Sequence, residues 1–254
     1  GRLPLFITYY RCNGYLRGGT GDEWPLRALA SHGIATLCID VLPGGVTGQA
    51  RYAIGLEAVR AAIDTLDRRG LVDRTRVGMG GLSFGSEVAI WTAMHSDLLK
   101  AVSIASVQIE PNYYWFNARP GRETFATNIR KNWKLGPPDE EPESWRELSA
   151  ALNIAKIRAP VLLQLPESEA RQSAELMSKL ATAHMGEAWL YPLAPHLKVE
   201  PRQKLAAYQR NLDWFRFWLK GEIDPDPAKT AQYQRWRALG SSNGEASIDA
   251  IQRS

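Results

Sequence analysis

The sequence predicts an α/β fold with a mainly parallel sheet and helices on both faces. Six short apolar runs rich in β-branched residues are typical of buried strands: 5–10, 34–40, 76–80, 101–107, 160–165 and 188–193. Helical patterns separate these runs, and strands that alternate with helices form parallel sheets. The chain has 254 residues, 44% hydrophobic and 23% charged, so it has enough apolar residues for a large core, and disorder is excluded for most of it.

Two of the predicted helices have clear faces and ends. A helix from Ile54 places Ala58, Ala61 and Leu66 on one face, and Gly70 stops it. A stripe of apolar residues at helical spacing marks the last long helix, which Gly221 ends: Leu205, Tyr208, Leu212, Phe215 and Leu219.

Residues 108–157 interrupt the alternation of strands and helices. They contain five prolines and an aromatic cluster at 113–116, and they resemble an insertion between two strands of the sheet. Such an insertion either shapes a pocket or packs on its own aromatics as a surface excursion, and both interpretations stay open. The polar tail, 240–254, is expected to fray. Because the chain opens on a predicted core strand, we expect it to be the C-terminal part of a longer protein, residues 1–239 forming one domain.

Composition argues against several classes of partner. No apolar stretch approaches the roughly 18 residues of a membrane span, and the N-terminus lacks the pattern of a signal peptide. The net charge is +4, but charges of both signs alternate along the chain, which argues against nucleic acid. Cys12 and Cys38 are interpreted as buried free thiols rather than as a disulfide. The compartment is left open, with a slight preference for the periplasm.

The sharpest motif is G-x-S-x-G at 81–85. It follows a predicted strand and precedes a predicted helix, the context in which a tight turn lifts a serine hydroxyl to the carboxyl edge of a sheet. The residues that flank such a serine must be small. Ser83 is therefore the predicted nucleophile, and the N–H of Phe84 is a predicted oxyanion donor.

A serine nucleophile needs a general base, normally a histidine. The chain has four histidines, and His196 lies in the loop after the last predicted strand, where the chain order nucleophile, acid, histidine places the base. His32 has a structural interpretation at a helix end, His95 lies too far along the helix after Ser83, and His184 lies near the end of another helix.

The third member of a triad is an acid that orients the imidazole. The loop after the strand at 160–165 contains no aspartate, so the candidates are Glu169 and Glu167, with Glu169 preferred because it lies farther beyond the strand. The alternative is a solvated acidic turn paired with Arg171. Tyr10, at the end of the first strand, is a candidate second oxyanion donor through its phenol, or else a packed aromatic residue.

No metal or cofactor is indicated. The histidines and cysteines lack metal-ligand spacing, and no Gly-rich phosphate-binding loop is present. The nine tryptophans are better explained by core and insertion packing than as a stacking platform.

These residues resemble the prolyl oligopeptidase family of serine peptidases, whose catalytic domain is an α/β-hydrolase fold that usually follows a β-propeller in the same chain. In that family the nucleophile, acid, base and oxyanion tyrosine match Ser83, Glu169, His196 and Tyr10. The sequence departs from the common family pattern in its early motif YYRCNGYLRGGTGDEWP, in its glutamate loop LPESEAR and in the residues around His196, LAPHLK.

Those departures are similar to the lasso-peptide isopeptidases of proteobacteria, which also use a glutamate as the triad acid. The resemblance implies that a threaded lasso peptide is the substrate and that hydrolysis of its isopeptide bond linearises it. It also implies an N-terminal β-propeller as a partner domain or chain. The alternatives are an oligopeptidase or esterase that acts on flexible substrates, and a non-catalytic binding module with a hydrolase fold.

Overall fold

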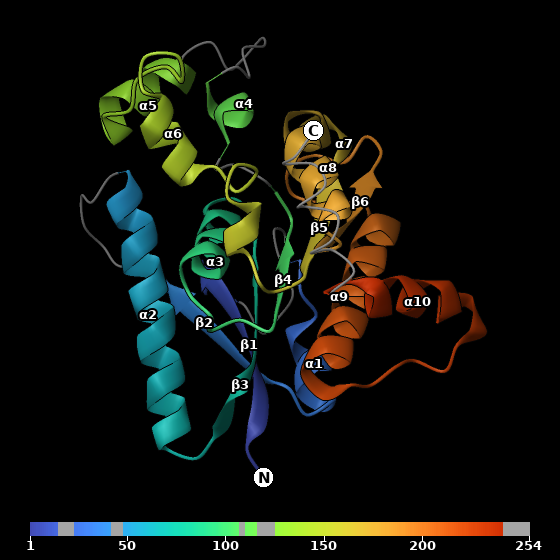
Figure 1. Ribbon diagram of the computed structural model, residues 1–254. Helices are drawn as coiled ribbons and strands as arrows, with labels where there is room; N and C mark the ends of the chain where they lie inside the picture. Colours follow the sequence, from blue (N-terminus) through green and yellow to red (C-terminus); the bar gives the residue numbers. More distant parts are fainter. Residues whose placement is uncertain (15–22, 42–47, 107–109, 116–124, 241–254) are drawn as a thin grey trace.

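A six-stranded parallel sheet forms the centre of the computed structural model, which describes residues 1–14, 23–41, 48–106, 110–115 and 125–240. The strand order is β2-β1-β3-β4-β5-β6, and each described pairing is parallel (Figure 1). The strands are β1 (Leu3–Tyr10), β2 (Ala35–Asp40), β3 (Val72–Gly81), β4 (Ala101–Ile104), β5 (Val161–Pro166) and β6 (Gly186–Tyr191). The six predicted strands and the α/β fold class are confirmed.

Helices follow most strands, and the helices that the sequence predicts from Ile54, after Ser83 and over 205–219 are present. The main helices are α1 (Leu26–Ser31), α2 (Gln49–Arg68), α3 (Phe84–His95), α8 (Ala174–Thr182), α9 (Pro201–Lys220) and α10 (Thr230–Ala238). Helix α2 begins before Ile54, and α10 was not predicted. Gly221 ends α9 in the left-handed conformation with φ 69°, which a residue without a Cβ adopts at little cost.

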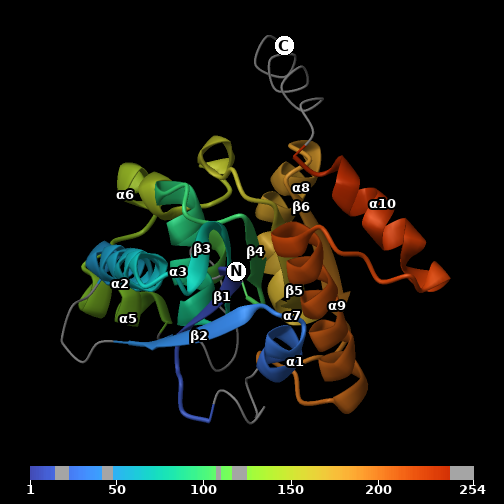
Figure 2. The ribbon, with the colours of Figure 1, turned by 90° about the horizontal axis from the view of Figure 1, so that it is seen from below.

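The core has two layers, one on each face of the sheet (Figure 2). Successive strand residues point to opposite faces. Leu5 and Ile7 of β1 therefore contact the apolar cluster under α2 and α3, whereas Phe6 contacts the cluster under α1, α9 and α10. Trp214 and Trp236 are fully buried in the second cluster, which confirms a core role for tryptophan.

In the segment 108–157, residues 111–114, 125–133 and 142–148 lie above the carboxyl ends of the strands (Figure 1), whereas residues 154–156 contact α3. They form α4 (Pro111–Tyr114), α5 (Phe125–Trp133), α6 (Pro142–Leu148) and the 3₁₀ helix η1 (Ile154–Lys156). Tyr113 and Trp145 are buried in the cluster shared with α2 and α3, so the segment packs on the main core and not on its own aromatics alone. Trp133 and Leu148 also line a pocket of about 170 Å³ beside the start of α2.

The two cysteines form a disulfide, so the expectation of free thiols was wrong. Cys12 follows β1 and Cys38 lies in β2, and the parallel register that pairs Tyr10 with Asp40 brings the two chain segments together. The bond joins residues 26 positions apart in the sequence, and Cα–Cα is 5.6 Å. The pairing depends on strand order, which the local apolar pattern around each cysteine does not reveal.

Across the described part of the chain, no helix has the length and apolar character needed to cross a bilayer. The predicted frayed tail, from residue 241 onward, and residues 15–22 of the early motif lie outside the described residues.

Candidate active site

Ser83 lies in the turn between β3 and α3, and its backbone is strained. Its φ of 57° and ψ of −127° lie where residues with a side chain are rarely found. The flanking glycines are required by space: a Cβ on Gly81 would lie 2.0 Å from the backbone of Gly85, and a Cβ on Gly85 would lie 2.3 Å from the carbonyl oxygen of Tyr9. The expectation that small residues flank the serine therefore has a direct steric cause.

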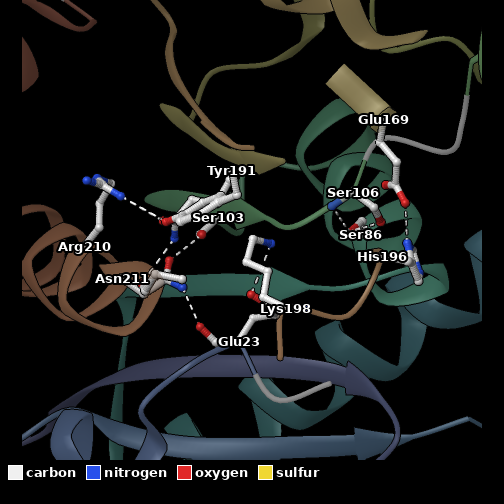
Figure 3. Close-up of polar contacts among 12 residues, drawn as sticks. Glu23, Ser86, Ser103, Ser106, Glu169, Tyr191, His196, Lys198, Arg210 and Asn211 are labelled. Carbon is white, nitrogen blue, oxygen red and sulfur yellow. Dashed lines mark hydrogen bonds and ion pairs between the residues drawn. The ribbon is translucent and has the colours of Figure 1, made fainter. Parts of the chain in front are cut away.

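Two buried serines hold this turn in place. The backbone N–H of Ser83 donates to the Oγ of Ser106 at 2.8 Å, and the Oγ of Ser86 donates to the carbonyl of Gly81 at 2.6 Å. The two hydroxyls lie 3.1 Å apart (Figure 3). Because Ser106 follows β4, the hydrogen bonds couple the turn to the neighbouring strand.

The two residues with candidate oxyanion donors contact each other through their rings. The rings of Tyr10 and Phe84 meet edge to face with centroids 5.5 Å apart, and the Tyr10 ring also borders Gly85. Phe84 is the first residue of α3, and the first N–H groups of a helix have no acceptor within the helix. The guanidinium of Arg51 lies over the Phe84 ring at 3.9 Å, which places a positive charge beside the turn.

Glu169 and His196 form a hydrogen bond, with 2.5 Å between the Oε1 of Glu169 and the Nδ1 of His196 (Figure 3). Glu169 is in the short helix α7 (Glu167–Ala170), which directly follows β5, and its side chain is only 3% exposed. His196 follows β6 and is 33% exposed. Glu167 instead forms an exposed ion pair with Arg171 at 3.6 Å. Of the two candidate acids, Glu169 is therefore the one that contacts His196.

All four predicted side-chain contributors come from one edge of the sheet. Tyr10 ends β1, Ser83 follows β3, Glu169 follows β5 and His196 follows β6. Since the strands are parallel, their carboxyl ends share that edge, which is where ligands bind in open α/β sheets. The catalytic roles themselves stay predictions.

The other histidines have local partners. The Nδ1 of His32 lies 2.8 Å from the carbonyl oxygen of Ala28 at the end of α1, and His95 stacks on Trp91 with ring centroids 3.9 Å apart. Burial lowers the pKa of His95, and the nearby Lys156 acts in the same direction. The carbonyl of His184 accepts from the N–H of Gly240 at 2.8 Å.

A buried ion pair lies beside the loop that contains His196, and the sequence did not indicate it. The Nζ of Lys198 is 3.2 Å from the Oε2 of Glu23, and neither side chain is more than 1% exposed. Burial raises the pKa of Glu23 and lowers the pKa of Lys198, while the mutual attraction of the two charges opposes both shifts. Because charged residues are usually solvated, the sequence does not indicate that these two are buried together. The one signal is that Glu23 lies in the motif GDEWP and Lys198 in the motif APHLK.

The residues that the structure describes contain no group of three or more histidine, cysteine or acidic side chains able to hold a metal ion.

No family model matches this chain. Among curated proteins, it is 32% identical to "Lasso peptide isopeptidase AtxE2" of Asticcacaulis excentricus over 94% of its own length. The chain spans 36% of the length of that relative.

Solved structures show the same similarity. An AtxE2 isopeptidase variant with Astexin3-dC4 bound superimposes with a TM-score of 0.83 at 31% identity, covering 94% of this chain and 39% of the other. A puromycin-hydrolyzing peptidase of Mycobacterium tuberculosis superimposes with a TM-score of 0.68 at 17% identity, covering 89% of this chain and 35% of the other. At that identity the second match shows the fold alone.

Proposed function

Since this chain is a relative of lasso peptide isopeptidase AtxE2 and has the α/β-hydrolase fold of prolyl oligopeptidase family peptidases, we propose that it is a serine hydrolase that cleaves the isopeptide bond of a lasso peptide. The observation that carries the proposal is the hydrogen bond between Glu169 and His196 in a chain that is similar to AtxE2 along 94% of its length. A glutamate in this place is the acid that the resemblance implies.

The proposed first half-reaction forms an acyl-enzyme. The Oγ of Ser83 attacks the isopeptide carbonyl while the Nε2 of His196 takes the hydroxyl proton. Glu169 accepts from the Nδ1–H of His196, which fixes the tautomer and stabilises the imidazolium. The phenol of Tyr10 and the N–H of Phe84 stabilise the oxyanion. The C–N bond then breaks, and His196 returns its proton to the leaving amine.

The second half-reaction consumes water. His196 takes a proton from a water molecule, whose oxygen attacks the acyl carbon bound to Ser83. Collapse of this intermediate breaks the ester bond and returns the proton to the Oγ of Ser83. The net change is the addition of one water to the peptide, so a ring becomes a linear chain.

The specificity of the proposed reaction comes from shape, because an isopeptide carbonyl is electronically close to a peptide carbonyl. We assign residues 1–239 to the catalytic domain, with an insertion at 108–157 and a polar tail at 240–254. An N-terminal β-propeller, as a domain or chain, would supply much of the substrate recognition. The Cys12–Cys38 disulfide supports the periplasm over the cytoplasm, since disulfides persist in oxidising compartments.

The test is mass spectrometry of a threaded lasso peptide and of its unthreaded branched-cyclic isomer after incubation with the full-length protein. We expect the threaded form to gain one water and the unthreaded isomer to stay unchanged. Ser83→Ala is expected to abolish the change, and Ser96→Ala is a matched control on the far end of α3.

Two outcomes would contradict the proposal. If the protein cleaves linear peptides and leaves the lasso peptide intact, it is a general oligopeptidase and not an isopeptidase. Failure of a fluorophosphonate probe to label Ser83 would instead favour a binding module without catalysis.

A further inference from the structure

We propose that the buried ion pair of Glu23 and Lys198, called the clasp below, positions His196. The pair connects the two ends of the loop that contains His196, the histidine loop, and thereby holds the imidazole against Glu169. The inference rests on the proposed serine hydrolase function. It adds two positioning residues that contact neither the substrate nor the reacting atoms.

The pair ties together both ends of the histidine loop. This loop spans residues 192–197, between Tyr191 at the end of β6 and Lys198. The ammonium of Lys198 lies 5.1 Å from the centre of the Tyr191 ring, so one cation contacts the residues that begin and end the loop. The carboxylate of Glu23 binds Lys198 twice, through the side chain at 3.2 Å and through the backbone N–H at 3.3 Å.

Glu23, and Tyr191 beside Lys198, are themselves anchored to the sheet and to α9 (Figure 3). The carbonyl of Glu23 accepts from the Nδ2 of Asn211 at 2.7 Å, and the Oδ1 of Asn211 accepts from Ser103 of β4 at 2.5 Å. The hydroxyl of Tyr191 donates to Gln164 of β5 at 2.7 Å and accepts from Arg210 at 3.0 Å. These hydrogen bonds connect the histidine loop to β4 and to β5, the strand that Glu169 follows.

Stability alone does not explain a pair buried this deeply. Two charges lose their hydration on burial, and apolar replacements of similar volume are often as stable or more stable. The pair does, however, impose a direction and a distance that an apolar contact does not. The histidine loop needs such a constraint at its centre, because Leu193 is 95% exposed and the apolar contacts of the loop come from the small Ala194 and from the partly buried Leu197.

The clasp also places charged groups beside Glu169 and His196. The cation of Lys198 interacts favourably with the carboxylate of Glu169, whose Oε2 is buried and has no hydrogen-bond partner among the described residues. Burial raises the pKa of Glu23, and the charge of Lys204, in α9, lowers it. Burial also raises the pKa of Tyr191, which the charge of Arg210 lowers and the charge of Glu23 raises further. Glu23 balances Lys198, so the removal of either partner changes the charges near His196.

The experiment uses Lys198→Met and Glu23→Gln in the full-length protein and measures the rate at which a fluorophosphonate probe labels Ser83 between pH 5 and 9. This reaction requires neutral His196 and no lasso peptide. We expect Lys198→Met to slow labelling about 10- to 100-fold, because small misplacements of a catalytic group are costly. Glu23→Gln is expected to reduce the labelling rate less than Lys198→Met does, since the amide oxygen of the new side chain still accepts from the N–H of Lys198.

The pH profile separates positioning from folding. Loss of the Lys198 cation in Lys198→Met favours the imidazolium and moves the acidic limb of the profile to higher pH, whereas loss of the Glu23 carboxylate in Glu23→Gln moves it to lower pH. Lys229→Met is the matched control, because it breaks the ion pair between Lys229 and the buried Asp213 at 2.8 Å. The control is expected to keep the wild-type pH profile even if it is less stable.

The inference is overturned if both variants label Ser83 at the wild-type rate per folded molecule with unshifted profiles. A wild-type protein that reacts with the probe but leaves lasso peptides intact counts against the proposed substrate and not against the clasp.

Discussion

The ring of Tyr10 meets the ring of Phe84 edge to face, with 5.5 Å between the centroids, so the end of β1 contacts the first residue of α3. This contact joins segments that lie more than seventy positions apart in the sequence. It brings the two residues with candidate oxyanion donors together beside the Ser83 turn, and the donors of an oxyanion hole must converge on one point.

Tyr10→Phe tests the phenol donor. Removal of one oxyanion donor lowers kcat by roughly 10²- to 10³-fold in serine hydrolases, and the retained ring preserves the contact with Phe84. We expect a loss of this size with an unchanged melting temperature, measured by isopeptide hydrolysis and thermal unfolding. Tyr9→Phe is the matched control, since the buried ring of Tyr9 also packs against Phe84, with centroids 5.9 Å apart, and loss of its hydroxyl is expected to leave kcat nearly unchanged. Equal losses in both variants would make Tyr10 a packing residue only.

Glu169→Gln tests the acid of the triad. An amide accepts from the Nδ1–H of His196 but carries no charge to stabilise the imidazolium, so kcat is expected to fall by roughly 10³- to 10⁴-fold. Glu167→Gln removes only an exposed ion pair with Arg171 and is expected to change kcat less than twofold. The measurement is the steady-state rate of each variant. The reverse order of losses would assign the acid to Glu167.

Loss of the Cys12–Cys38 disulfide is expected to destabilise the fold. A bond that closes a loop of 26 residues restricts the unfolded chain and contributes about 3 kcal/mol. Denaturant unfolding of Cys12→Ser/Cys38→Ser should show this decrease relative to the oxidised wild type. Reductant should destabilise the wild type and leave the double variant unchanged; an equal response of both proteins would show that the cysteines are not bonded.

Glu110 makes stability depend on pH. Burial raises its pKa to about 7, and hydrogen bonds from Ser149 and from the N–H of Ala151 oppose the shift. Since the folded pKa lies above the ordinary value of 4.5, the folded state binds the proton more tightly, and the stability from this group is full below pH 4.5 and lost as the pH rises through 7.

Glu110→Gln removes this titration and preserves an acceptor for Ala151. Relative to the wild type, the variant is expected to gain about 1 to 3 kcal/mol between pH 4.5 and pH 8. Urea unfolding at several pH values measures the difference. Parallel stability curves for the two proteins would show that Glu110 ionises normally.

Local patterns in the sequence were enough to predict the six strands, the glycine-flanked serine turn and the loop of His196. Each of these depends on neighbouring residues: apolar runs form strands, small residues permit the turn at Ser83, and chain order places a histidine after the last strand. The start of α2 and the presence of α10 were missed, because packing on the sheet stabilises helices beyond their own pattern.

The tertiary structure alone decided which distant side chains meet. Both glutamates of the acid loop have the same local chemistry, but the short helix α7 buries Glu169 against His196 and leaves Glu167 in solvent. The disulfide needs β1 and β2 to be neighbours, and the clasp needs Glu23 to reach Lys198. Such contacts depend on strand order and on the relative placement of loops. The free energy that fixes that placement comes from burying both faces of the sheet, a property of the whole chain.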